Sequence, residues 1–313
     1  MIDRFLKTFA ISTLLFSYAS FAAEAVDQQQ NVQSDPSVKV KVQRGKVTFE
    51  SWDKNQISVT GTLDELSQGF IFNVKGNKVT IEDKLPRQYN GRNKDGSALT
   101  ITLPKQLKLQ VEGVSADYSL DSLIGKLDIN SVSGNIKANS LQQNASLQTV
   151  SGDILTKGLN GDINLQTVSG DIKDTQSQGN VNYQLVSGEL TADTQANKVS
   201  VESVSGDAAI VLAEVDSLNV KTVSGDLELS VNNLTSSATL GSVSGDIDIK
   251  LLTATDIMVD INGGPGGKII NQLTDDPVTK GKYSPQSYLK FQTGNGNAEL
   301  AISTISGKIE LTK

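Results

Sequence analysis

A Val-Ser-Gly triplet that returns at a nearly constant interval constrains the fold of this chain more than any other feature. Successive triplets lie 18, 18, 18, 18, 19 and 20 residues apart, and their glycines are Gly134, Gly152, Gly170, Gly188, Gly206, Gly225 and Gly245. An imperfect copy, Val114-Ser115-Ala116, stands one further step of the common length upstream. A fixed period of this length predicts stacked structural units in place of an ordinary globular core.

Each unit divides into two segments of equal length, for example 152–160 and 161–169. In the second segment Ile163 and Leu165 alternate with polar residues, which is the period of a β-strand. We place the valine of the triplet, here Val168, on the same inward-facing apolar column. The corner glycine supplies backbone conformations that other residues rarely adopt, and Asp or Ser beside it can bond nearby amides.

Two other architectures fit the pattern less well. Apolar residues do not recur at helical spacing, and Gly, Asn or Asp interrupts each segment. A left-handed helix with three shorter sides per turn would need apolar residues at 154, 160 and 166, whereas the chain has Ile154, Asn160 and Gln166. The prediction is therefore an all-β, single-domain parallel β-solenoid with two-sided coils of about 18 residues and irregular N- and C-terminal capping segments.

The chain outside the repeat divides into further segments. Residues 1–25 have the charged start, short apolar stretch and small-residue end of a secretory signal peptide, and no cysteine follows to carry a lipid. The lone Trp52 is expected to cover the first coil. The predicted boundaries are a signal peptide at 1–25, a disordered leader at 26–37 and a solenoid at 38–313, with opening coils at 38–113, regular repeats at 114–250 and a C-terminal excursion with closing strands at 251–313.

Composition excludes several kinds of activity. The net charge of −7 speaks against nucleic acid as a partner. The chain has no His and no Cys, so catalytic triads that need them and His-ligated zinc are ruled out. A glycosidase with two carboxylates stays open in principle, but no acidic pair stands out from the repeat. We therefore expect a non-enzymatic protein without a cofactor, and no segment after the signal peptide is apolar enough to span a membrane.

An acidic ladder is the first candidate site. The residue after each corner Gly or Ala is acidic in seven of eight coils: Asp117, Asn135, Asp153, Asp171, Glu189, Asp207, Asp226 and Asp246. Stacking would bring these carboxylates to within roughly 4.8 Å of one another. One interpretation is Ca²⁺ between the coils, with Asp153, Asp171, Asp207, Asp226 and Asp246 as ligands. The favoured interpretation is that each side chain accepts hydrogen bonds at its own corner, because one glycine per segment brings too few carbonyls to an ion.

Three further features invite a functional interpretation. Asp174 occupies a column that is otherwise apolar, and a local bulge that turns its side chain to water is the favoured explanation. The glycine-rich stretch at 263–267 lacks the helix of a phosphate loop, which favours a turn. Two long loops combine lysine or arginine with tyrosine, and binding often resides in such loops. The loop candidates are Arg87, Tyr89, Arg92, Lys280, Lys282, Tyr283 and Tyr288.

The repeated Val-Ser-Gly-Asp-Ile motif resembles the bacterial β-strand-repeat family known as putative adhesin, a domain of unknown function. The stretches at 45–53, at 99–104 (LTITLP) and at 305–311 (ISGKIEL) are similar to that family as well. The resemblance covers most of the mature chain and brings no catalytic residues. It implies a surface-binding role, and the excursion at 263–290 departs from the simple repeat.

These observations predict an exported, non-catalytic interaction protein of the periplasm or cell surface. It would bind an envelope glycan or protein through its polar faces or long loops. The two alternatives are a Ca²⁺-stabilised module that uses the acidic ladder and a carbohydrate-active enzyme. The sequence alone sets neither the ligand nor the oligomeric state.

Overall fold

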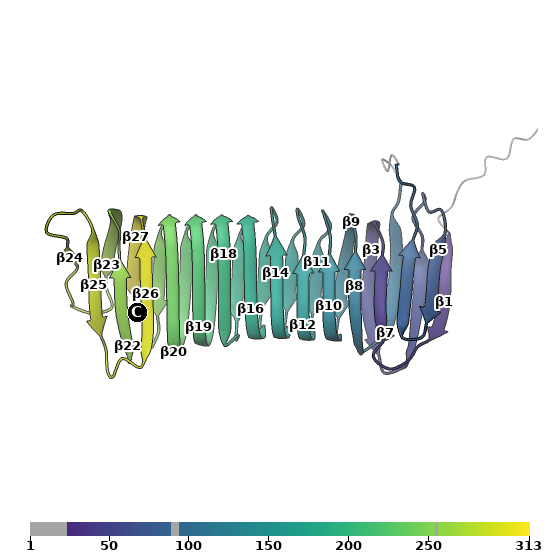
Figure 1. Cartoon of the computed structure of the whole chain (residues 1–313), viewed down its shortest axis with the longest axis horizontal. Coiled ribbons are helices and arrows are strands. Elements are labelled where there is room, and N and C mark those ends of the chain that lie inside the picture. Colours follow the sequence, from purple (N-terminus) through teal and green to yellow (C-terminus); the bar gives the residue numbers. More distant parts are fainter. Residues whose placement is uncertain (1–23, 89–93, 254–255) are drawn as a thin grey trace, which may run out of the picture.

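A computed structural model describes residues 24–88, 94–253 and 256–313 of the chain, so most of the predicted signal peptide lies outside the described residues. The described residues form 27 β-strands and no helix. The strands stack along one axis into an elongated body, with the N-terminal strands at one end and the C-terminal strands at the other (Figure 1). No segment among these residues is a helix long and apolar enough to cross a membrane.

The repeat stacks in parallel with the predicted offset. Strand β11 (Ile136–Asn139) pairs with β13 (Ile154–Lys157), and Ile136 lies opposite Ile154, one full repeat later. Strand β12 (Gln142–Gln148) pairs in the same way with β14 (Asn160–Thr167). Every coil thus gives one strand to each of two faces, which makes the chain solenoid-like through the repeat.

The two faces continue beyond the repeat at both ends. In spatial order, the first face contains β1 (Ala25–Asn31), β4 (Gln56–Thr62), β7 (Ser97–Pro104), β3 (Arg44–Trp52), β9 (Ser115–Asp121), β11, β13, β15 (Ile172–Thr175), β17 (Leu190–Thr194), the first parts of β19 (Ala208–Ser224) and β20 (Leu227–Ser244), β21 (Ile247–Leu251), β27 (Ser306–Thr312) and β23 (Gly266–Asn271).

The second face contains β5 (Phe70–Lys75), β6 (Lys78–Asp83), β2 (Ser37–Lys41), β8 (Gln106–Glu112), β10 (Ile124–Asn130), β12, β14, β16 (Gln178–Ser187), β18 (Lys198–Ser205), the last parts of β19 and β20, β26 (Ala298–Thr304), β22 (Ile257–Asn262), β25 (Ser287–Gln292) and β24 (Thr279–Lys280).

The core lies between the faces and follows the strand period. Inward columns such as Leu127 and Ile129 are almost fully buried. The triplet valines, however, do not belong to the core, and the prediction that they face inward was wrong. Alternation from Ile129 places Ser131 inward and Val132 outward, and Val132 is 48% exposed. The inward hydroxyl of Ser131 is needed at the corner, where it accepts the N–H of Gly134 at 3.0 Å.

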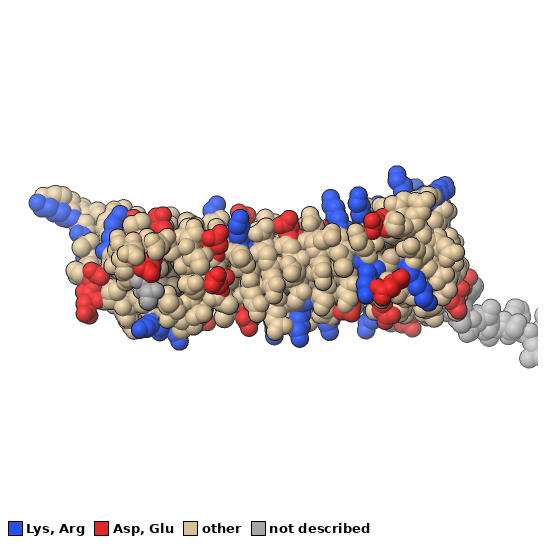
Figure 2. Space-filling view, turned by 90° about the horizontal axis from the view of Figure 1, so that it is seen from below, with Lys and Arg blue, Asp and Glu red and all other residues tan. Residues whose placement is uncertain are grey.

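The outward valines form one continuous row, which we call the valine stripe. It consists of Val114, Val132, Val150, Val168, Val186, Val204, Val223, Val243 and, in the last position, Ile305. Main-chain bonds between coils hold the row in register, as from Ser151 N–H to the carbonyl of Val132 at 2.8 Å. The opposite edge of the stack carries scattered charged side chains of both signs (Figure 2). On the edge that carries the valine stripe, each valine of the repeat is followed by an exposed serine, so an apolar row and a hydroxyl row run side by side.

The corner glycines are required by close packing between coils. A Cβ atom on Gly206 would lie 2.0 Å from the carbonyl oxygen of Gly188, and the φ angle of Gly206 is +139°. A Cβ atom on Gly152 would meet the carbonyl of Gly134 at 2.1 Å, although the φ angle of Gly152 is not in the left-handed region. The repeated glycine thus reflects contact with the preceding coil at every corner, and a special backbone conformation only at some of them.

The N-terminal end differs from the prediction. Residues 26–37 are not a disordered leader, because β1 pairs antiparallel with β4 along its whole length and buries Val26. The opening strands are not simple coils either: β4 is antiparallel to both β1 and β7, and β5 with β6 forms an antiparallel hairpin. Trp52 does not cover the first coil. It is half-buried at the turn between β3 and β4, and its Nε1 donates to the carbonyl of Gln56.

The C-terminal end inserts its last strands into the stack. Strands β22 and β23 form the outermost coil, and the later strands β26 and β27 lie between this coil and the repeat. The glycine-rich stretch at 263–267 is the corner between β22 and β23, in agreement with the prediction of a turn. Strand β25 then covers the open edge of β22 in antiparallel orientation. Antiparallel strands thus lie at both ends of the mostly parallel stack.

Candidate functional site

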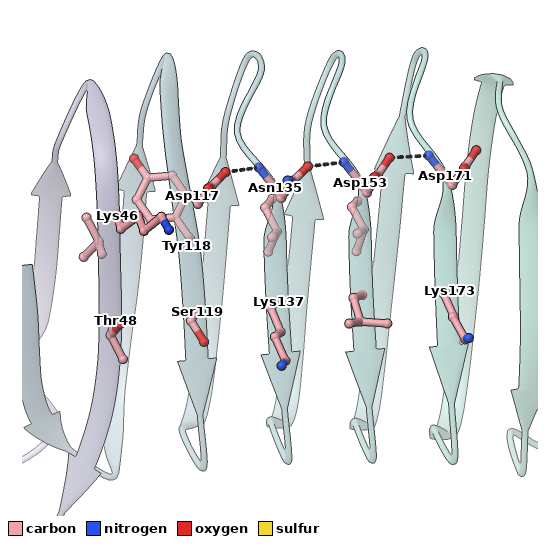
Figure 3. Close-up of a pocket in the computed structure, with 14 residues that line it drawn as sticks. Lys46, Thr48, Asp117, Tyr118, Ser119, Asn135, Lys137, Asp153, Asp171 and Lys173 are labelled. Carbon is pink, nitrogen blue, oxygen red and sulfur yellow. Dashed lines mark hydrogen bonds between the residues drawn. The ribbon is translucent and has the colours of Figure 1, made fainter. Parts of the chain in front are cut away.

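The acidic ladder runs along the first face where each strand begins. The Oδ1 atom of Asp117 accepts the N–H of Asn135 in the next coil at 2.9 Å. The Oδ1 atom of Asn135 accepts from Asp153 at 2.8 Å, and that of Asp153 accepts from Asp171 at 3.0 Å (Figure 3). Asp207 and Asp226 repeat the bond toward the C-terminus at 2.8 Å. These ladder side chains thus each accept the main-chain amide of the equivalent residue in the next coil, just before the strand begins.

This geometry favours the structural interpretation of the ladder over the calcium interpretation. The bonds run to the next coil, whereas we expected them at each residue's own corner. Among the described residues, no group of three or more His, Cys, Asp or Glu side chains could hold a metal ion. Lysines stand at both ends of the row: Lys46 lies opposite Asp117, and the amide of Lys308 donates to Asp246 at 2.7 Å.

The side chain of Lys308 balances charge at the C-terminal end of the first face. Its Nζ lies 2.9 Å from Asp248 and 2.9 Å from Glu310. The hydrogen bond to Asp248, supported by that to Glu310, raises the pKa of Lys308 above its ordinary value. This cation is therefore already paired within the protein.

A groove of about 550 Å³ lies over the first face beside the N-terminal half of the ladder. It crosses β3, β9, β11, β13 and β15 (Figure 3). The ladder residues form one wall. The next outward residue on each strand forms a second row that contains Thr48, Ser119, Lys137, Leu155 and Lys173.

The lysines of the groove are available for binding. Lys137 and Lys173 lie two coils apart, roughly 10 Å by the strand spacing, with Leu155 between them. Both lysines are exposed and neither forms an ion pair with the described part of the chain. The ladder Asp residues beside them use Oδ1 for the neighbouring coil and remain exposed. The groove thus offers cationic donors, anionic acceptors and one apolar contact in parallel rows.

The second face carries rows of amide and hydroxyl groups. Asn182 donates to Asn164 at 2.8 Å, and Asn180 donates to Asp162 at 2.7 Å. These side chains line a shallow depression of about 500 Å³ over β10, β12, β14 and β16. Lys126 is the single cation that lines this depression, so the depression has no lysine pair like that of the groove.

Asp174 is buried, so the expectation that a bulge turns it to water was wrong. Its side chain has no exposed surface and accepts three hydroxyl donors at 2.6 Å each, from Thr156, Ser177 and Tyr183. Burial, and next the charge of Asp174, raise the pKa of Tyr183 well above its ordinary value. The cluster is closed on itself in the core, which indicates a structural role.

The basic loops do not converge on one site. Arg87 is exposed after β6 near the N-terminal end, while Tyr89 and Arg92 fall outside the described residues. Lys280, Lys282, Tyr283 and Tyr288 lie at the opposite end of the stack, on and around β24 and β25 (Figure 1). There the Nζ atom of Lys282 sits 5.4 Å from the ring centre of Tyr283, which is 90% exposed. The two loops can serve only as separate contacts.

The groove itself was missed by sequence reasoning, although its signal was present. Lys137 and Lys173 share one position of the repeat, and their outward placement follows from strand alternation. We overlooked this position because the ladder residues, which lie two positions earlier in each coil, are more regular. Lys46 comes from the irregular opening region, where the period gives no register.

Parallel coils with a repeated corner define this chain as a β-repeat protein of the solenoid-like class. The chain belongs to the Toastrack DUF4097 family, whose model matches residues 36–312. This is a domain family of unknown function, and the match confirms the resemblance seen in the repeated motif. No curated protein matches the chain.

Solved structures that resemble the chain have low sequence identity. A putative adhesin from Bacteroides fragilis NCTC 9343 is 14% identical, with 93% of this chain and 98% of that chain covered and a TM-score of 0.38. A putative lipid binding protein from Parabacteroides distasonis ATCC 8503 is 18% identical, with coverages of 92% and 97% and a TM-score of 0.41. A putative adhesin from Parabacteroides merdae ATCC 43184 is 12% identical, with coverages of 93% and 97% and a TM-score of 0.29. The names of these proteins assign no ligand to this chain.

Proposed function

We propose that this protein is an exported, non-catalytic binding protein of the cell envelope that holds a glycan or protein partner on its first face. The observation that carries the proposal is the groove across five strands, with Lys137 and Lys173 exposed and without ion pairs to the described residues. Long binding surfaces are a common use of stacked repeats. Export rests on the signal-peptide pattern at 1–25, and the solenoid at 38–313 is taken as a single domain.

The chemistry of the groove favours recognition over reaction. Its acidic residues are equivalent members of one row and each accepts a main-chain amide, so none is set apart as an acid or base. The lysines keep their charge exposed to solvent. Hydroxyl-rich or carboxylate-bearing chains match such rows, because lysine donates to carboxylate and the outer Asp oxygens accept from hydroxyl or amide groups.

Repetition explains how weak contacts can suffice. The rows advance by roughly 4.8 Å per coil, so an extended partner meets the same donors and acceptors several times. An exposed charged contact contributes about 1 kcal/mol or less. Several such contacts along one chain give useful affinity only when the partner is itself repetitive or extended.

Co-sedimentation of the mature protein with purified envelope fractions tests this proposal. We expect saturable binding that falls about tenfold in the double variant Lys137→Ala/Lys173→Ala, since two contacts of about 0.7 kcal/mol each correspond to that factor. The matched control is Lys126→Ala/Lys198→Ala on the second face. Equal binding by both variants, or no binding by the wild type, would refute the assignment to the groove.

The same assay separates the two classes of partner. Envelope fractions treated with protease retain binding if the partner is a glycan and lose it if the partner is a protein. Calcium chelator included in parallel samples tests the ladder: a loss of binding in chelator would replace the groove by a calcium-dependent site.

A further inference from the structure

The inward columns of the repeat contain a group of polar side chains that the proposed function does not use. It surrounds the buried carboxylate and consists of Thr156, Asp174, Ser177 and Tyr183, which we call the Asp174 cluster. The equivalent positions of neighbouring coils are apolar: Ala138 and Ala192 for the first two, Leu141 and Leu159 for Ser177, and Leu165 and Val201 for Tyr183. These four departures from the apolar pattern therefore meet at one place in the stack.

The cluster lies in the coil where the corner of the repeat changes its geometry. At the earlier corners an inward hydroxyl accepts the N–H of the glycine: Ser131 for Gly134, Thr149 for Gly152 and Thr167 for Gly170. At the next corner Leu185 takes the place of that hydroxyl, opposite Thr167. From there onward the corner glycines have positive φ angles, such as +139° for Gly188 and +121° for Gly225. The repeat thus consists of two blocks of similar coils, and the coil at 171–187 joins them.

The contacts that all coils share do not distinguish one stacking register from another. The ladder bond, the contact at the corner glycine and the apolar columns recur from coil to coil. If the coil at 153–170 were looped out, β15 would pair with β11 and these contacts would form again, because the loss is one whole repeat. The native register buries one coil more, so a slipped stack of this kind is a trap during folding.

We propose that the Asp174 cluster fixes the register in which the two blocks stack. In the native register Asp174 lies opposite Thr156 and accepts its hydroxyl at 2.6 Å. In the slipped register Asp174 would lie opposite Ala138, which has no hydroxyl, and Thr156 would leave the core with its coil. Ser177 and Tyr183 belong to the same coil as the carboxylate and would move with it. The slipped register therefore removes one donor from a buried acceptor, which is costly.

The chemistry of the cluster suits the selection of a register better than the addition of stability. Asp174 has no exposed surface, and the ion pairs of the described residues do not include it. Burial of a carboxylate is costly even when hydroxyl groups donate to it. Apolar side chains of similar volume are often as stable as a buried polar group, and a single buried polar residue can set the register of a coiled coil.

Disulfide trapping during refolding tests the proposal on the full chain, which has no cysteine of its own. The pair Ser146→Cys with Asn182→Cys reports the slipped register. These outward positions lie two coils apart in the native stack and would be adjacent after the slip. Two coils span roughly 10 Å, which is too far for a disulfide. The matched control is Asn164→Cys with Asn182→Cys, because these two positions are adjacent in the native register.

Both reporter pairs are placed in the wild-type chain and in the apolar variant Thr156→Val/Asp174→Val/Ser177→Ala/Tyr183→Phe. Each protein is unfolded in urea, diluted to refold and oxidised at successive times, and its disulfides are identified by peptide mass spectrometry. We expect the slipped disulfide to be at least tenfold more frequent in the apolar variant at late times. The control disulfide should form in both backgrounds. Equal amounts of the slipped disulfide in the two backgrounds would overturn the proposal.

Two coil deletions supply a second measurement that does not depend on the apolar variant. Deletion of 135–152 keeps Thr156 against Asp174, whereas deletion of 153–170 removes Thr156 and builds the slipped contact permanently. Both deletions shorten the chain by one repeat. In urea, the unfolding equilibrium constant should be at least tenfold larger for the deletion of 153–170, because a buried acceptor has lost a donor. Equal stability of the two deletion variants would overturn the proposal.

Discussion

Replacing Asp174 by alanine offers the sharpest test of the core. The carboxylate has no exposed surface and accepts three hydroxyls at 2.6 Å. Its loss leaves the hydroxyls of Thr156 and Ser177 without that acceptor, and each buried unpaired group costs about 1–3 kcal/mol. Tyr183 retains Thr194 nearby as a partner and contributes less. We therefore expect Asp174→Ala to lower the free energy of unfolding by about 3–5 kcal/mol.

A second substitution separates hydrogen bonding from volume. Tyr183→Phe removes one donor, so the double variant Asp174→Ala/Tyr183→Phe should be less destabilised than the sum of the single variants by about 1–2 kcal/mol. Asp174→Asn keeps the volume and lets the hydroxyls turn, and a cost of about 1–2 kcal/mol is expected.

Urea unfolding followed by circular dichroism and by the fluorescence of Trp52 provides the free energies. Coincident transitions with the two probes would establish that unfolding is cooperative across the stack. A change below about 1 kcal/mol for Asp174→Ala, or a gain in stability, would show that the buried carboxylate contributes nothing net and would refute this reasoning.

Four further outcomes follow from the structure. Gly206→Ala should lower the free energy of unfolding, measured in urea, by about 2–4 kcal/mol. Gly69→Ala should lower it clearly less, because Gly69 has nearly the same φ of +137° but no atom within 4 Å of an added Cβ. Equal losses would show that backbone strain alone is the cause. Burial raises the pKa of Tyr118 and Tyr183. The stability that these two side chains contribute is therefore complete below the unfolded tyrosine pKa of about 10 and is lost as pH rises above that value. Tyrosine absorbance should show that these two groups ionise only when the protein unfolds. The hydrogen bond from Lys39 lowers the pKa of Glu112, so stability declines as pH falls through the carboxyl range. Glu112→Gln should reduce this loss of stability by no more than about 0.5 kcal/mol. A larger effect in thermal melts would contradict the surface position of Glu112. Calcium or chelator should leave the melting temperature unchanged, because the ladder Oδ1 atoms are bonded to amides, and a saturable rise with calcium would contradict that account.

The sequence predicted those parts of the fold that repeat. The repeat interval and the strand alternation determine that Ile136 pairs with Ile154, and the structure confirms this register. The valines were misplaced because the triplet was assigned to the apolar column on hydrophobicity. The period counted from Ile129 points Val132 outward, and the inward hydroxyl of Ser131 shows why a polar residue belongs there.

Features without a period could not be predicted in the same way. Asp174 was expected at the surface because a lone buried carboxylate is costly, and its partners come from three separate strands or turns. Strand β1 has one buried apolar residue, so its sequence is that of a polar leader until its partner β4 is known. The insertion of β26 and β27 before the outermost coil leaves no local trace in the chain.

The ladder bond has a consequence for how such a chain can evolve. A coil of the repeat brings its own acceptor and its own corner glycine. At the corner it needs only a main-chain amide of the next coil and close contact with a main-chain carbonyl of the preceding coil. A tandem duplication of one repeat's codons therefore inserts a coil whose requirements any neighbour meets. Selection can lengthen or shorten the body by whole coils, provided that side chains matched between adjacent coils, such as Thr156 and Asp174, stay together.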